Sequence, residues 1–284
     1  MKKIAVSTDT NCSLTVGEAN KLGVYLLPMP INIDGKEYFE NETISYDEFM
    51  TKLKSGSKVF TSQPSVEAVC ALWDEALKQA EYVIHVPMDS VLSGSYQTAV
   101  MLSKEYDGRV KVVDVRRVSL PSLQAIYDIL YLIDKDYDVD DIVKIVNNNS
   151  NNYSCYVVLD ELEHLKKGGR INAATALIGE ILAVKPIIEF VDGALKTNSK
   201  THGILKGEKK IIELIKNDLN TKFVGKKVNF HIAYSCSRQE AIKFKDKACA
   251  ELGLSDIVMA ELPASLACHI GAGSRGISVE EVVE

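Results

Sequence analysis

The amino-acid sequence predicts an α/β protein of two domains, and three observations support this prediction. The chain has 284 residues, enough for one large domain or two of ordinary size. Short β-rich runs alternate with segments of helical spacing, which is typical of βαβ units around a parallel sheet. Six polar, turn-prone residues at 147–152 (Asn-Asn-Asn-Ser-Asn-Asn) separate two patterned segments. We therefore expect domains of residues 1–150 and 153–284.

Hydrophobic spacing and helix-breaking residues position the elements of the first domain. The first helix is expected to open at Ser13 and to end at Gly23, and another is expected to start after Pro64. The apolar stretch at 24–33 is extended and is followed by Asp34-Gly35, which predicts a hairpin turn. The other expected strands are 3–7, 82–86 and 110–114, and the expected helices are 13–23, 46–53, 65–79, 95–106, 120–133 and 139–146.

The alternation continues beyond residue 152. The turn Val191-Asp192-Gly193-Ala194 lies between short extended runs and predicts a hairpin over residues 186–200. A helix is expected at 173–184, ending at Pro186. The remaining expected strands are 155–159, 227–234 and 257–262, and the remaining helices are 205–219 and 238–252.

Composition excludes several classes of function. The chain has 33 Lys and Arg residues against 39 Asp and Glu residues, a formal net charge of −6. This balance disfavours a nucleic-acid partner and a surface built for anionic lipid, since both use clustered cations. The first residues lack the apolar core of a signal peptide, and no apolar run approaches the ~18 residues of a membrane span. The six cysteines are scattered without a C-x-x-C pair, so neither disulfides nor zinc sites are expected. We expect a cytoplasmic protein.

Two motif matches do not carry the function that their pattern suggests. Residues 271–276 fit G-x-G-x-x-G, but only eight residues follow, too few for the helix and distant acidic residue of a dinucleotide site. A glycine-rich turn is the better interpretation. Residues 134–138 resemble the start of a calcium loop but lack its glycine and final glutamate. A phosphate-binding loop, a hydrolase elbow and a zinc-protease motif are also absent from the sequence, so no cofactor or metal is expected.

Two hydroxyl-rich segments that open helices are the best candidates for a binding site. Residues 60–65 (Phe-Thr-Ser-Gln-Pro-Ser) and 92–97 (Leu-Ser-Gly-Ser-Tyr-Gln) have this composition, and the second follows the strand at 82–86. Helix openings leave backbone N–H groups unpaired, and hydroxyls beside them favour an anion. Ligands of open α/β sheets bind outside the carboxyl ends of the strands, where these segments would lie. The alternative is that these serines only cap helices.

Five ordered motifs together resemble the DegV family. They are Thr61-Ser62-Gln63-Pro64, Leu92-Ser93-Gly94-Ser95-Tyr96, Lys166-Lys167-Gly168-Gly169-Arg170-Ile171, Val184-Lys185-Pro186-Ile187 and His269-Ile270-Gly271-Ala272-Gly273. With Val6-Ser7-Thr8-Asp9 they cover nearly the whole chain. The resemblance implies an N-terminal Rossmann-like domain with a parallel sheet and a C-terminal α/β domain with a mixed sheet, with the lipid pocket between them.

The family comprises bacterial proteins that bind a long-chain fatty acid. The resemblance implies that this chain is the lipid-binding subunit of a fatty acid kinase system and lacks catalysis of its own. It would present the fatty-acid carboxylate to a separate ATP-dependent kinase, which makes acyl-phosphate for phospholipid synthesis. Only transient membrane contact, for ligand exchange, is expected.

Carried over by position, the resemblance assigns the carboxylate to Thr61, Ser93 and His269. Ser62 and Gly94 would lie beside it, and Arg170 would lie where the kinase docks. His202 stands where many members carry an arginine expected to face the kinase, so coupling is expected to be weak or pH-dependent. The alternative hypothesis is an acyl hydrolase with Ser93 as nucleophile and His269 as base.

Overall fold

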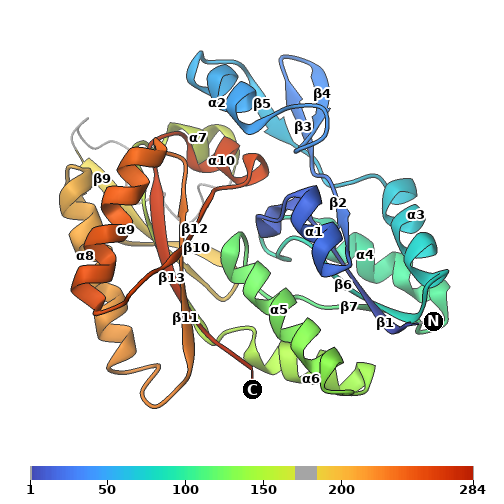
Figure 1. Ribbon diagram of the computed structural model, residues 1–284. Helices are drawn as coiled ribbons and strands as arrows, with labels where there is room; N and C mark the ends of the chain where they lie inside the picture. The colour runs from blue at the N-terminus through green and yellow to red at the C-terminus, as the bar shows by residue number, and fades with distance from the viewer. Residues whose placement is uncertain (1, 170–183, 284) are drawn as a thin grey trace. The chain divides into compact units, whose positions relative to one another are not determined.

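The computed structural model describes residues 2–169 and 184–283, and its chain divides into two units. Unit 1 comprises residues 1–151, 263–265 and 283–284, and unit 2 comprises residues 152–262 and 266–282. Each unit has its own sheets and its own hydrophobic core (Figure 1). The predicted α/β class is confirmed, with a parallel sheet in unit 1 and a mixed sheet in unit 2.

Unit 1 is built on a four-stranded parallel sheet of order β2-β1-β6-β7. A three-stranded antiparallel sheet of order β4-β3-β5 is inserted between β2 and β6. The strands are β1 (Lys2–Asp9), β2 (Val24–Leu27), β3 (Pro30–Ile33), β4 (Lys36–Phe39), β5 (Val59–Thr61), β6 (Ala80–Val86) and β7 (Val110–Val112). The helices are α1 (Val16–Leu22), α2 (Tyr46–Lys54), α3 (Val66–Leu77), α4 (Ser95–Ser103), α5 (Leu120–Asp134) and α6 (Val139–Asn149), with short 3-10 turns at Thr10–Cys12 and Lys104–Tyr106.

Local sequence explains where these helices begin and end. Thr15 caps α1 through a capping box with Glu18, and Gly23 ends the helix in the left-handed conformation at φ +67°. The turn at Asp34-Gly35, with φ +52° and +87°, joins β3 to β4 as predicted. Helices α3 and α4 lie next to each other on the sheet (Figure 1). The buried Trp73 of α3 belongs to the core cluster there, together with Ala99 of α4. The chain passes from β1 to β2 on one side and then to β6 on the other side of β1, so the topological switch point lies between β1 and β6. Open α/β sheets bind ligands at such a point.

Unit 2 contains a six-stranded sheet of order β10-β9-β8-β13-β11-β12. Only the β11–β12 pair within it is parallel. Helices α8 and α9 pack together over the sheet and bury an isoleucine-rich core (Figure 1). The strands are β8 (Tyr153–Val158), β9 (Val184–Val191), β10 (Ala194–His202), β11 (Val228–Tyr234), β12 (Val258–Glu261) and β13 (Arg275–Glu281). The helices are α7 (Glu163–Lys167), α8 (Ile204–Leu219), α9 (Arg238–Leu252) and α10 (Ala264–Ile270).

The second half of the chain departs from the expected elements in several places. The helix predicted at 173–184 lies outside the described residues except for Val184, which begins strand β9 instead of ending a helix. The predicted hairpin is confirmed as β9 and β10, joined at Asp192-Gly193. Helix α7, helix α10 and strand β13 were not predicted, although β13 is central in its sheet. The sequence at 147–152 is partly helical, because α6 continues to Asn149.

Candidate functional site

The carboxyl ends of β1 and β6 are joined through the buried carboxylate of Asp9. Its Oδ2 accepts the backbone N–H of Met88 at 2.7 Å, and its Oδ1 accepts the backbone N–H of Asn11 at 2.9 Å. Burial raises the pKa of Asp9, and these hydrogen bonds oppose that rise. Asp9 therefore fixes the loop after β6 relative to β1, at the switch in strand order.

The loop after β6 carries Ser93 into the opening of α4. The Ser93 Oγ lies 2.8 Å from the Ser95 Oγ and accepts the backbone N–H of Ser95 at 3.2 Å. Gly94 is the exposed N-cap residue of α4 and has no side chain to cap the helix. The half-buried Ser93 hydroxyl thus lies at the helix opening and bonds its first N–H group, in the environment that the sequence predicts for an anion.

The Thr61 segment packs against this helix opening within unit 1. The Thr98 Oγ1 on α4 donates to the Gln63 Oε1 at 3.2 Å. A Cβ at Gly94 would lie 2.9 Å from the same Gln63 Oε1, so glycine allows this close approach. Thr61 ends β5, is half-buried and pairs with Ile31 of β3. The structure therefore brings two of the sequence motifs together.

The serines of these two segments have different roles. Ser65 caps α3 by accepting the N–H of Ala68 at 3.2 Å, so the capping interpretation is confirmed there. Ser62 is exposed, and its N–H donates to the Pro30 carbonyl at 3.4 Å. The assignment of Ser62, Thr61 and Ser93 to a ligand stays a prediction.

His269 lies on α10 in unit 2 and is half-buried. A Cβ at Gly168 would overlap the His269 Nδ1, so the Lys166–Gly169 motif and the histidine motif meet. Gly271 follows at φ +82°, and a Cβ there would lie 2.8 Å from the ring of His164. The His164 Nε2 lies 3.0 Å from Glu161 Oε1. No role was predicted for His164 from the sequence, because its contact with the turn at Gly271 arises only in the folded chain.

Hydrogen bonds of the Ser235 side chain and backbone hold the glycine-rich turn after His269. The Ser235 Oγ donates to the Gly271 carbonyl at 2.6 Å and accepts the Ser274 N–H at 3.1 Å. The Gly273 N–H donates to the Ser235 carbonyl at 3.1 Å. The turn leads directly into β13 instead of a helix, which agrees with a glycine-rich turn and not with a dinucleotide loop.

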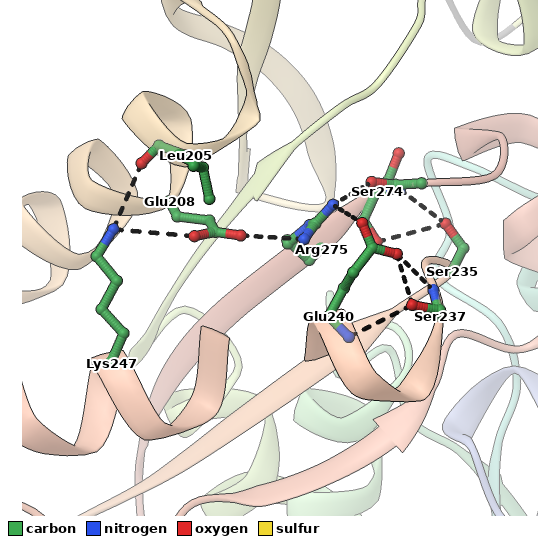
Figure 2. Close-up of polar contacts among 9 residues, drawn as sticks. Leu205, Glu208, Ser235, Ser237, Glu240, Lys247, Ser274 and Arg275 are labelled. Atoms are coloured by element: carbon green, nitrogen blue, oxygen red, sulfur yellow. Dashed lines mark hydrogen bonds and ion pairs between the residues drawn. The ribbon is translucent and has the colours of Figure 1, made fainter. Parts of the chain in front are cut away.

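Ion pairs of the buried Arg275, which follows this glycine-rich turn, connect it to two helices. Figure 2 shows Arg275 between Glu208 of α8 and Glu240 of α9. Its Nη1 lies 3.0 Å from Glu208 Oε1, and its Nη2 lies 3.7 Å from Glu240 Oε1 and 3.2 Å from the Gly273 carbonyl. Burial raises the pKa of Glu208, and the charges of Arg275 and Lys247 oppose this rise. Removing Arg275 would leave the buried Glu208 carboxylate with only the more distant Lys247 Nζ, at 3.8 Å, among the cations described.

The two predicted docking residues have different outcomes. Arg170 lies outside the described residues. His202 is exposed at the end of β10, where it pairs with Val184.

A separate cavity of about 630 Å³ lies at the opposite end of the parallel sheet in unit 1. Its lining includes Gly23 and Val24 at the start of β2 and Gln79 and Ala80 at the start of β6. None of the predicted binding residues lines it. Within residues 2–169 and 184–283, no group of three or more His, Cys, Asp or Glu side chains is arranged to hold a metal ion. Over the same ranges, no helix has the length and apolarity to span a membrane.

A parallel sheet with hydroxyl groups at its carboxyl edge defines an open α/β protein of the kind that binds ligands at that edge. The chain belongs to the DegV family of uncharacterised proteins, whose sequence profile matches residues 3–282. The DegV domain-containing protein TTE1491 of Caldanaerobacter subterraneus subsp. tengcongensis is 29% identical over 283 residues, covering 99% of this chain and 100% of the relative.

Two solved structures of the family are similar over their whole length. A fatty-acid-binding DegV family protein from Thermus thermophilus has a TM-score of 0.89 and 27% identity, covering 99% of this chain and 100% of that one. The fatty-acid-binding DegV family protein SAG1342 from Streptococcus agalactiae has a TM-score of 0.86 and 26% identity, covering 100% of both chains. Homologues of this chain therefore bind fatty acids.

Proposed function

We propose that this chain binds a long-chain fatty acid and that Thr61 and Ser93 hydrogen-bond its carboxylate. The observation that carries the proposal is the packing of the Thr61–Pro64 segment against the opening of α4, through Gln63, Gly94 and Thr98. This packing brings the segment that contains Thr61 beside the opening of α4, where Ser93 lies and where the N-cap residue Gly94 has no side chain. Such an arrangement suits an anion. The fatty-acid binding of two relatives supports the choice of anion.

The energetics favour a buried acyl chain with a hydrogen-bonded head group. Each CH₂ removed from water contributes ~0.8 kcal/mol, so a tail of about 15 carbons gains roughly 12 kcal/mol before entropic losses. An unpaired carboxylate in the same environment would cost several kcal/mol. Hydroxyl donors at the head group are therefore required for tight binding.

Mass spectrometry of lipid extracted from the gently purified protein tests the ligand class. We expect a stoichiometric fatty acid. Protein that carries no fatty acid and fails to bind one added at micromolar concentration would overturn the proposal. Incubation with acyl esters tests the hydrolase alternative, which requires release of free fatty acid.

Variants test the assigned head-group donors. Thr61→Ala/Ser93→Ala should keep the fold and weaken fatty-acid binding by several-fold to hundreds-fold, because a hydrogen bond contributes ~0.5–1.5 kcal/mol between neutral groups and ~1.5–3 kcal/mol to a charged group. Thr51→Ala/Ser103→Ala is the matched control, since these hydroxyls bond only their own helices in the part of the chain described. Equal affinity of the two double variants would place the carboxylate elsewhere. The prediction for His269 is tested separately by His269→Ala.

We further propose that the bound carboxylate is presented to a separate ATP-dependent kinase that forms acyl-phosphate. Support comes from the sequence, which lacks a phosphate-binding loop of its own. His202→Arg, which introduces a permanent charge, should raise acyl-phosphate formation with a cognate kinase and leave fatty-acid affinity unchanged. Equal rates for both forms between pH 6 and pH 8 would exclude a docking role for this position.

A further inference from the structure

One buried carboxyl group organises the loop that carries Ser93. The Asp89 Oδ1 accepts the backbone N–H groups of Val91 at 2.9 Å and Leu92 at 3.1 Å. The Asp89 carbonyl oxygen accepts the N–H of Ser93 at 3.1 Å. Asp89 is 0% exposed, so these bonds are shielded from water. A single residue thus fixes three successive backbone positions that end at the proposed head-group donor.

The second oxygen of this carboxyl group is in a different situation. The Asp89 Oδ2 is buried and has no hydrogen-bond partner within the described part of the chain. An ionised carboxylate with one unsatisfied buried oxygen is costly. Burying the neutral carboxylic acid costs less free energy, because it carries no net charge to desolvate.

The charged groups that act on Asp89 come from the segment after β7. Asp114 opposes its ionisation, and Arg116 favours it. Tyr96 of α4 is influenced by the same two residues. Burial dominates and raises the pKa of Asp89 to about 7, although its two backbone hydrogen bonds oppose the rise. The group therefore changes charge near neutral pH.

We propose that Asp89 is the positioning residue of the Ser93 loop and that it takes up a proton when a fatty-acid carboxylate binds at Ser93. This inference rests on the proposed function. The Asp89 carboxyl accepts the N–H groups of Val91 and Leu92, the two residues before Ser93, so an anion bound at Ser93 lies near this buried carboxyl. Two like charges at such a distance disfavour each other, and the bound anion therefore favours neutral Asp89. By linkage, ionisation of Asp89 weakens the binding of the anion by the same factor.

The sign of the pH dependence follows from this linkage. At pH 6 Asp89 is mostly neutral and binding is unhindered. As the pH rises above 7, Asp89 loses its proton in the ligand-free protein. Binding of the fatty acid then requires Asp89 to take up a proton again. Affinity should then fall by about three- to tenfold between pH 6.5 and pH 8.5.

The test measures the affinity of a fluorescent long-chain fatty acid, kept below its critical micelle concentration, from pH 6 to pH 8.5. Asp89→Asn keeps an oxygen for the Val91 and Leu92 N–H groups but cannot take up a proton. It should match the wild-type affinity at pH 6 and lose the wild-type pH dependence. Asp89→Ala should bind weakly at every pH, because it loses the hydrogen bonds that position the loop.

A second variant and a direct proton measurement keep the test decisive if Asp89→Asn is unstable. Asp114→Asn removes the like charge and should move the wild-type midpoint to lower pH. Calorimetry of the wild type at pH 7.5, in two buffers with different ionisation enthalpies, should show net proton uptake on binding. Binding without proton uptake, or with the same pH dependence in Asp89→Asn, would overturn the role of Asp89 and leave the proposed function standing. Absence of binding at every pH would overturn both.

Discussion

At the residue scale, the most unusual environment outside the Ser93 loop is that of Glu40. This carboxyl group is buried in unit 1, where its Oε2 accepts the Thr10 hydroxyl at 2.7 Å. Its Oε1 accepts the N–H of Ala264, which begins α10 and belongs to unit 1 like Glu40 itself. The Thr10 Oγ1 in turn accepts the N–H of Met29 at 3.0 Å. Burial raises the pKa of Glu40 from 4.5 to about 7, and these hydrogen bonds only partly oppose it.

Glu40 should make the folded state less stable as the pH rises. Between pH 4.5 and pH 7 the folded protein retains a proton that the unfolded chain has released, so unfolding becomes easier across this range. The expected loss in the free energy of unfolding is roughly 3 kcal/mol. Glu40→Gln should remove most of this dependence, as measured by urea unfolding at pH 5 and pH 8. The exposed Glu42→Gln is the matched control and should keep the wild-type dependence. A similar slope for all three proteins would contradict the assignment.

At the element scale, Gly207 allows α8 to pack closely on β8. A Cβ at this position would overlap the Cγ2 of Val158, a fully buried and stiff side chain. Overpacking costs ~1–3 kcal/mol, and alanine recovers about 1 kcal/mol in helix propensity. Gly207→Ala should therefore destabilise the protein by up to about 2 kcal/mol, measured as a lower urea midpoint.

Gly17 in α1 provides the opposite case for the same substitution. It is exposed, and nothing lies within 4 Å of a Cβ built there. Gly17→Ala should therefore stabilise the protein by ~0.5–1 kcal/mol. Urea midpoints that shift in the same direction for Gly17→Ala and Gly207→Ala would show that the contact with Val158 does not limit packing.

The elements also show how far the sequence could predict the fold. The end of α1 at Gly23 and the turn at Asp34-Gly35 were predicted where they occur, and the opening of α1 was predicted at Ser13, close to its N-cap residue Thr15. Strand β13 was missed because its pattern depends on a distant partner. Glu280 is fully buried there, and the Nδ1 of His231 on β11 lies 2.7 Å from its Oε2. A charged residue in a short run near the end of the sequence indicates exposure unless that partner is known.

The candidate site was predictable to a similar extent. Hydroxyl-rich helix openings could be identified from composition, because capping and anion binding require local residue types. The close approach of Gln63 to Gly94 could not be predicted from composition, since it joins segments that a helix and a strand separate in the sequence. The burial of Asp89 was also missed, although this residue comes three positions after the predicted strand at 82–86. Its burial, which changes the chemistry of its carboxyl group, is a property of the packed loop and not of the sequence.

At the scale of the whole molecule, ligand binding should be visible as stability. A ligand that binds only the folded state stabilises it by ~2.7 kcal/mol at a concentration of 100 times Kd. For a protein of 284 residues this corresponds to a rise in Tm of roughly 5 °C. We expect a saturating long-chain fatty acid to produce such a shift in the delipidated wild type, measured by scanning calorimetry. Thr61→Ala/Ser93→Ala should show a smaller shift at the same ligand concentration, because the stabilisation depends on the logarithm of the ratio of ligand concentration to Kd, and weaker binding lowers that ratio. A long-chain alcohol of equal length is the ligand control, since it buries the same tail without a carboxylate. An equal shift for the alcohol and the acid would mean that tail burial alone stabilises the protein, and the head-group assignment to Thr61 and Ser93 would then be wrong.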